Sequence, residues 1–131
     1  MLHGVTQTRL GAPDGNCLEA AIATLLQIPI DAVPDLRAVN GHLPEAARWE
    51  LARRRRPVLQ RWLASHGLRL VGGSGFPPPE HAGWYIASGP GPRGLRHAVV
   101  YSQGQLAWDP HPDRTGLYYA DGWTAIERLE G

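Results

Sequence analysis

The chain has 131 residues, 43% of them hydrophobic, and its formal net charge at pH 7 is +1. This length suffices for one hydrophobic core, so we expect a single domain over residues 1–131. The nearly neutral charge excludes a general electrostatic attraction to nucleic acid or to a membrane surface. All 13 basic residues are arginine, which fits a G+C-rich genome and excludes lysine as a catalytic group.

The cysteine content and the N-terminus bear on the compartment. A single cysteine cannot form an internal disulfide and fits a reducing compartment. The N-terminus lacks the apolar run of a signal peptide, and no stretch approaches the roughly 18 apolar residues of a membrane-spanning helix. We therefore expect a cytoplasmic protein with no membrane partner, and the oligomeric state stays open.

A first helix is expected directly after a turn formed by Gly-Ala-Pro-Asp-Gly at residues 11–15. Asn16 is a favourable N-cap residue, and Glu19 stands three residues later in the capping-box position. Pro29 ends the helix, and residues 30–34 are expected to form a short helical turn or a loop. The apolar residues at helical spacing are Leu18, Ile22, Leu25 and Leu26.

A second helical region is predicted from Glu45 to His66, opened by Pro44 and ended by Gly67. Pro57 interrupts this region, so we expect a kink or two abutting helices. Its expected core-facing residues are Trp49, Leu59, Trp62 and Leu63.

Four consecutive arginines, residues 53–56, are a candidate nucleic-acid interface because guanidinium groups can neutralise phosphates. Four consecutive helical residues, however, spread around about one full turn and form no single stripe. The pattern therefore favours a solvated helix end over nucleic-acid binding, which stays an alternative.

After residue 67 the pattern changes to strands and turns, with strands expected at 68–71, 84–87, 97–101, 106–109 and within 123–129. Gln103-Gly104 predicts a tight hairpin between the third and fourth strands. Residues 76–79 and 88–96 are rich in proline or glycine and are expected to be loops. Trp84 and Trp108 are expected in the core. The predicted fold is α+β, with an N-terminal helix packed on a small antiparallel sheet and a middle helical region.

Cys17 is the candidate nucleophile. At the first turn of a helix, unpaired N–H groups and the helix dipole stabilise a thiolate and lower its pKa. The competing interpretation is a small buried hydrophobic residue, which is the commonest role of a lone cysteine.

His97 and Asp109 are the candidate partners of Cys17. His97 opens the strand Ala-Val-Val-Tyr, and Asp109 closes the next strand. Because a hairpin makes these strands antiparallel neighbours, both residues are expected at the same end of the sheet. A thiol needs an imidazole to take its proton, and the imidazole needs a third group that orients it. The alternatives are an ordinary strand histidine and an Asp-Pro turn.

This order of residues and elements resembles the papain-like cysteine peptidase superfamily, and in size its small bacterial members such as bacteriocin-leader peptidases. The resemblance rests on Gly-Asn-Cys at the head of the first helix, on His97 at a strand start and on Asp109 at the end of the following strand. It implies a papain-like fold and a Cys-His-Asp triad.

The resemblance also implies an oxyanion-stabilising glutamine upstream of the nucleophile. Gln7 is the only glutamine before Cys17, although its separation is longer than is typical of papain. Its amide and the Cys17 N–H would form the donor pair, and Asn16 is an alternative donor. In related enzymes an indole covers the His-Asp hydrogen bond, and Trp108 is the candidate here.

Further residues are candidates for the substrate pocket. Arg93 and Arg96 lie on the loop that leads into His97 and suit a bidentate contact with a carboxylate, or else a salt bridge within the loop. His111 is a candidate for lining the cleft and a second choice as base. A zinc site made by Cys17, His97, Asp109 and His111 matches no metal-binding spacing.

The sequence therefore predicts a cysteine peptidase or isopeptidase that needs no cofactor or metal and acts on a peptide or protein substrate. An amidase or acyltransferase would use the same triad. A catalytically idle peptide-binding domain is the alternative from another class.

Overall fold

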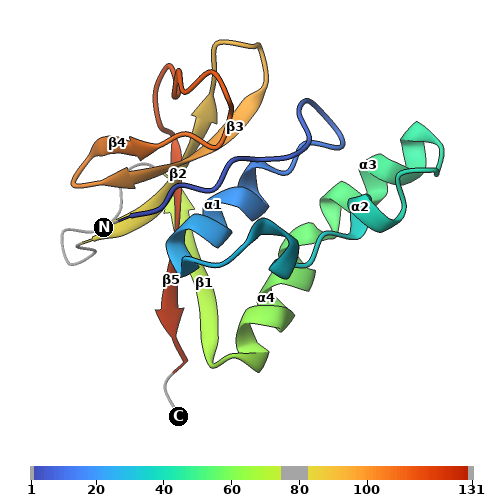
Figure 1. The fold of residues 1–131 in the computed structure, drawn as a ribbon, viewed down its shortest axis with the longest axis horizontal. Helices are drawn as coiled ribbons and strands as arrows, with labels where there is room; N and C mark the ends of the chain where they lie inside the picture. Colours follow the sequence, from blue (N-terminus) through green and yellow to red (C-terminus); the bar gives the residue numbers. More distant parts are fainter. Residues whose placement is uncertain (1, 75–82, 130–131) are drawn as a thin grey trace.

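The computed structural model describes residues 2–74 and 83–129 (Figure 1). The expected loop at 76–79 lies outside these residues. The helical elements are α1 (Cys17–Leu26), the 3-10 turn η1 (Ile30–Ala32), α2 (Leu36–Val39), α3 (Glu45–Arg53) and α4 (Arg55–Ser65). The strands are β1 (Leu68–Ser74), β2 (Trp84–Pro90), β3 (Arg96–Ser102), β4 (Gln105–Trp108) and β5 (Gly122–Arg128). None of the described helices has the length and apolarity needed to cross a membrane.

The strands form one antiparallel sheet in the order β1-β5-β2-β3-β4, which confirms the expected α+β class. The predicted hairpin between β3 and β4 is confirmed, with φ of 54° at Gln103 and 78° at Gly104. These two positive φ values match a turn whose twist suits the flanking strands. The insertion of β5 between β1 and β2 is a long-range pairing that no local pattern announced.

Both faces of the central strands are covered. On one face α1 packs on β3 and β2, and α4 packs on β1. Side chains alternate along β3, so Ala98 and Val100 join the helix-facing core while Val99 joins a cluster on the opposite face. Leu117 and Ala120 from the segment before β5 pack against that second cluster. The helix-facing core also contains Leu18, Ala21, Ile22, Leu59, Leu63, Leu70 and Ile86.

The predicted interruption of the middle helical region is confirmed as two helices, α3 and α4, that meet at Arg54. Pro57 lies in the first turn of α4, where a missing N–H breaks no intrahelical hydrogen bond. Gly67 adopts the left-handed conformation after α4, with φ of 73°. Leu59 and Leu63 are fully buried, and Trp62 packs at the core edge, as expected.

Two tryptophans expected in the core are not there. Trp49 is 41% exposed because α3 extends away from the sheet and buries none of its residues fully. Trp84 is 46% exposed because it stands at the very first position of β2. The expected loop at 88–96 is also shorter, since β2 continues to Pro90 and β3 begins at Arg96.

The expected capping box at α1 is wrong. Asn16 Oδ1 accepts from the N–H groups of Thr8 and Arg9 and makes no cap bond to the helix. Glu19 is buried and binds the guanidinium of Arg37 instead. Tertiary contacts with the N-terminal strand-like segment and with α2 therefore hold the start of α1.

We predict that Leu63→Ala lowers the free energy of unfolding by about 2–5 kcal/mol, because it leaves a cavity between α4 and the sheet. Val39→Ala is the matched control, since Val39 is 78% exposed and its truncation is expected to cost less than about 0.5 kcal/mol. Urea unfolding measures both. Equal losses in the two variants would contradict the packing of α4 on the sheet.

Candidate active site

Cys17 is the first residue of α1 and lines an open pocket of about 790 Å³. Five other candidate residues line the same pocket, so the structure brings six of the sequence-predicted site residues together; the five are Gln7, Arg93, Arg96, His97 and His111. The walls come from the segment before α1, from the α3–α4 region and from the loop between β2 and β3.

His97 and Asp109 are in direct contact at the end of the β3–β4 hairpin. His97 Nε2 lies 2.6 Å from Asp109 Oδ1. The same oxygen accepts the N–H of His111 at 2.8 Å, and Oδ2 accepts the N–H of Gly116 at 2.7 Å. Both side chains are buried. The carboxylate therefore fixes the orientation of the imidazole, which is the role expected of the third member of a triad.

The Cys17 thiol interacts with the His97 ring in a way that changes the pKa of both groups. Burial raises the pKa of Cys17, but several opposing contributions together outweigh it, so the pKa is lowered; the largest of them are a hydrogen bond to His97 and the charge of His97. The backbone N–H of Ala98 and the charge of Arg55 act in the same direction. The thiolate is thus favoured relative to a free cysteine.

His97 shows the complementary change. Burial lowers its pKa, but the hydrogen bonds and charges of Asp109 and Cys17 outweigh burial and raise the pKa to about 9. Burial also raises the pKa of Asp109, whereas His97 and the N–H groups of His111 and Gly116 lower it further than burial raises it. These shifts all favour a thiolate, an imidazolium and a carboxylate in sequence, relative to the same groups in isolation.

Gln7 lies beside the nucleophile. Its backbone N–H donates to Pro110 O at 3.0 Å, and its side-chain Nε2 donates to Arg9 O at 2.8 Å. A side-chain amide nitrogen carries two hydrogens, so one remains for a group bound in the pocket. These two contacts hold Gln7 in place.

Two further candidate residues, Asn16 and Trp108, lie outside this pocket. Asn16 is buried, and its amide group bonds to Thr8 and Arg9. The indole of Trp108 donates to Val5 O at 2.9 Å and lies under the guanidinium of Arg114, 4.0 Å from the ring centroid. Both residues therefore hold the structure around the site and do not line the substrate pocket.

His111 lines the pocket with its ring edge toward His97, at 6.1 Å between ring centroids. Burial and the charge of Arg93 lower the pKa of His111, with smaller opposing contributions from nearby carboxylates. Its Nδ1 accepts the N–H of Asp113 at 3.0 Å. The neutral ring therefore carries its proton on Nε2 and can donate a hydrogen bond from it.

Arg93 and Arg96 both line the pocket, but only one keeps its charge free. Arg96 forms a bidentate ion pair with Asp121 at 2.9 and 2.5 Å, which is the loop salt bridge weighed against substrate binding. Arg93 donates to the hydroxyl of Thr115 at 3.0 Å. Arg93 therefore remains a candidate for an anionic ligand.

The sequence reasoning missed Arg55. Within the run of four arginines, Arg53 and Arg54 pair with Glu50 on the surface, and Arg56 donates to Thr124 Oγ1. Arg55 is half-buried and lines the pocket. The prediction of a solvated helix end is therefore right for Arg53 and Arg54 but not for Arg55.

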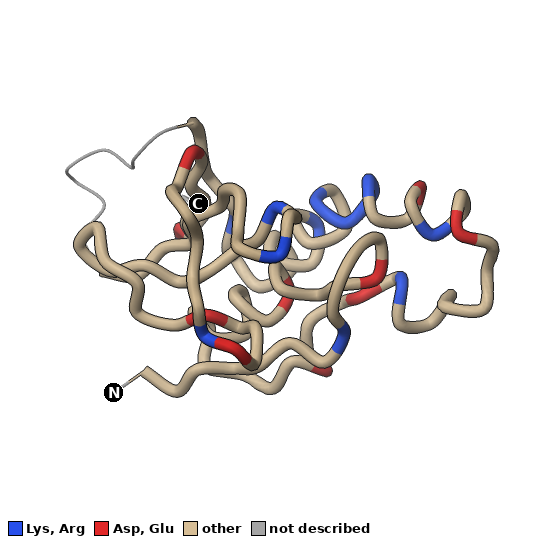
Figure 2. Tube along the Cα trace, turned by 90° about the horizontal axis from the view of Figure 1, so that it is seen from above, with Lys and Arg blue, Asp and Glu red and all other residues tan. Residues whose placement is uncertain are grey.

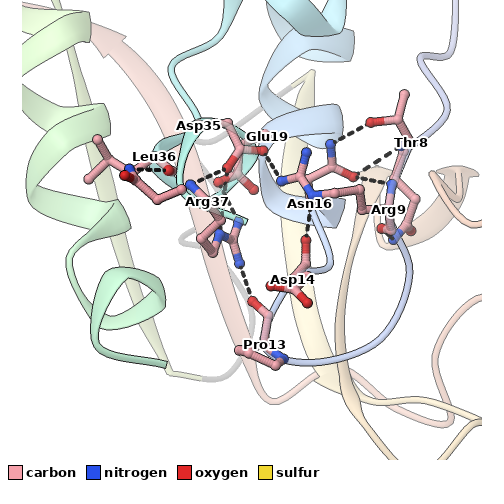
Figure 3. Close-up of polar contacts among 11 residues, drawn as sticks. Thr8, Arg9, Pro13, Asp14, Asn16, Glu19, Asp35, Leu36 and Arg37 are labelled. Carbon is pink, nitrogen blue, oxygen red and sulfur yellow. Dashed lines mark hydrogen bonds and ion pairs between the residues drawn. The ribbon is translucent and has the colours of Figure 1, made fainter. Parts of the chain in front are cut away.

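A buried polar network behind the pocket was also missed (Figure 3). Arg37 donates to Glu19 Oε2 at 2.9 Å and to Pro13 O at 2.8 Å, with both charged side chains almost fully buried. Arg9 pairs with Asp35, the N-cap of α2. This network ties the loop before Cys17 to α1 and α2.

In the loop at 11–15 the backbone of Gly15 comes very close to the backbone of Gly11. The N–H of Gly15 donates to Gly11 O at 2.7 Å, and a Cβ on Gly15 would lie 2.2 Å from that oxygen. Glycine is therefore required there, one residue before Asn16, and the turn delivers Cys17 to the pocket.

Within residues 2–74 and 83–129, no group of three or more His, Cys, Asp or Glu side chains is arranged to hold a metal ion. The chain matches no protein-family model, and no curated protein or solved structure is significantly similar to it.

Proposed function

We propose that the protein is a cysteine peptidase or isopeptidase of papain-like fold. The observation that carries this proposal is the contact of His97 Nε2 with Asp109 Oδ1 at 2.6 Å, at an open pocket that both Cys17 and His97 line. The opposite pKa shifts of Cys17 and His97 support it. The order of elements, a nucleophile helix followed by helices and an antiparallel sheet that carries the base, supports the fold assignment.

The reaction follows from these positions. The Cys17 thiolate attacks the carbonyl carbon, and the oxyanion accepts hydrogen bonds from the Gln7 amide and from the Cys17 N–H, which has no intrahelical acceptor. The His97 imidazolium protonates the leaving amine, which departs and leaves an acyl-thioester. Neutral His97 then takes a proton from water, and the resulting hydroxide displaces the thiolate. Asp109 keeps the ring oriented throughout.

The pocket suits a peptide chain. Three large apolar side chains that are exposed, Leu10, Trp49 and Leu95, all line it. Exposed apolar side chains gathered at a concave site are typical of ligand binding. A peptide with apolar residues would cover them, which also accounts for the position of Trp49.

Turnover of a peptide substrate distinguishes an enzyme from a non-catalytic peptide-binding domain. We predict that the protein cleaves members of a proteome-derived peptide library, detected by mass spectrometry, and that Cys17→Ala lowers the cleavage rate at least about 1,000-fold. Binding of peptides without any cleavage or acyl-enzyme would contradict the peptidase and favour the binding domain.

If Cys17 and His97 form a thiolate-imidazolium pair, the rate at which iodoacetamide alkylates Cys17 should depend on pH differently from that of a free thiol. A free thiol loses reactivity below about pH 8.5, whereas Cys17 should react rapidly well below it. The thiolate is stabilised by an imidazolium as long as His97 keeps its proton, up to about pH 9. Because Asp109 raises the pKa of His97, Asp109→Asn should weaken this stabilisation and shift the alkylation profile toward higher pH. His97→Gln should return the thiol to an ordinary profile. His42→Gln, at an exposed histidine, is the control, and a profile unchanged by His97→Gln would refute the dyad.

Gln7 can be tested by comparing two reactions of Cys17. Acylation by p-nitrophenyl acetate passes through an oxyanion, whereas alkylation by iodoacetamide does not. We predict that Gln7→Ala slows acylation about 10- to 1,000-fold and changes alkylation less than about twofold. Stopped-flow release of p-nitrophenolate and mass spectrometry measure the two rates. An equal effect on both reactions would assign Gln7 a structural role only.

A further inference from the structure

Arginine side chains line the pocket around Cys17. Five arginines line it, namely Arg37, Arg53, Arg55, Arg93 and Arg96. Among the described lining residues there is no aspartate or glutamate. Figure 2 shows the blue arginine positions gathered along the helical arm formed by α3 and α4.

Three of these arginines form ion pairs with partners outside the pocket lining. Arg37 pairs with Glu19, Arg96 pairs with Asp121, and Arg53 shares Glu50 with Arg54. Within the described part of the chain, Arg55 and Arg93 form no ion pair. The net positive charge of the pocket therefore comes mainly from these two side chains.

Arg55 and Arg93 come from two different walls of the pocket. Arg55 comes from the start of α4, and its charge acts on Cys17. Arg93 comes from the loop between β2 and β3, and its charge acts on His111. Both positive charges are thus felt at the end of the pocket where the carbonyl group would react.

An unpaired guanidinium at a concave site suits an anion of the ligand. Arginine binds carboxylates through two parallel N–H donors and remains charged at every physiological pH. A pocket of one charge sign with low-dielectric walls also concentrates ligands of the opposite sign. The exposed apolar side chains on the same walls favour an organic acid over a bare inorganic ion.

We propose that Arg55 and Arg93 make the pocket selective for peptides that carry a carboxylate close to the scissile carbonyl, supplied by an acidic side chain or by a chain end. This inference rests on the proposed function and names the substrate class of the same site. Arg55 and Arg93 are the specificity-determining residues.

The test compares an anionic and a neutral reagent of similar size, iodoacetate and iodoacetamide, in their reaction with Cys17. Both alkylate the same thiolate, so the ratio of their rate constants does not depend on the thiolate fraction. The ratio for the protein is normalised to that of N-acetylcysteine amide. His97 attracts iodoacetate as well, and for this reason the arginine variants are decisive.

We expect the ratio to fall about threefold in Arg55→Gln or Arg93→Gln and about tenfold in the double variant. Arg55→Lys, which keeps the charge, should retain the ratio within about twofold. Arg54→Gln is the matched control, because Arg54 pairs with Glu50 and does not line the pocket. For the unmodified protein, added salt should lower the ratio toward that of the double variant.

An unchanged ratio in the arginine variants and in salt would overturn the anionic selectivity while leaving the cysteine peptidase intact. Slow iodoacetamide labelling with the profile of a free thiol would instead refute the proposed function. A peptide library distinguishes the two carboxylate sources, since cleavage sites next to Asp or Glu indicate a side chain and cleavage confined to the last residues indicates a chain end. Cleavage sites without any such carboxylate would also overturn the proposal.

Discussion

The buried carboxylate of Asp109 organises the reactive end of the molecule. Its oxygens accept hydrogen bonds from the ring of His97 and from the N–H groups of His111 and Gly116. A buried charge without partners is strongly unfavourable, so these donors are held around it. The hydrogen bonds of Asp109 therefore fix three things together: the end of the hairpin, the orientation of the imidazole and the path of the following segment. The state of Cys17 depends on it, because an unoriented imidazole would not stabilise the thiolate.

A second buried charge pair, Glu19 and Arg37, fixes another part of the pocket. Glu19 and Arg37 lie between α1 and α2, and Arg37 also binds Pro13 O. Burying such a pair gives little net stability, and the attested use of buried charges is to specify one arrangement. Here the arrangement specified is the loop at 11–15, which forms a pocket wall and precedes Cys17. The pair therefore positions the site more than it strengthens the core.

The sequence predicted those features that depend on interactions between residues close together in the chain. Proline at position 57 announced the division into α3 and α4, Gln103-Gly104 announced the hairpin, and that hairpin alone brings Asp109 to His97. In each case neighbours in sequence are neighbours in space. The contact with Cys17 needed one further assumption, that α1 packs on β3, and it follows from two apolar faces that must be buried together.

The features that the sequence concealed all depend on distant partners. Glu19 fits a capping box as well as it fits a buried ion pair, and only the position of Arg37 on the unexpected helix α2 decides between them. Trp49 matches the helical period of a core residue, yet it lines the pocket because α3 leaves the sheet. Arg55 is one of four identical neighbours, and its role is set by which helix turn faces Cys17. The sequence thus showed which chemical groups are present, whereas tertiary contacts decide which partner each group has.

Activation of the nucleophile and selection of the substrate are coupled through the same charges. Burial of Cys17 opposes ionisation of the thiol, so its thiolate requires nearby positive charge, which His97 and Arg55 supply. Positive charge placed for that purpose also attracts an anionic ligand, because it acts through the same low-dielectric pocket. A carboxylate bound at His97 or at Arg55 would neutralise part of this charge and raise the pKa of the thiol. Arg93 acts on His111 from another wall, so a carboxylate held partly by Arg93 leaves more of the charge that stabilises the thiolate, and activation and selection can coexist.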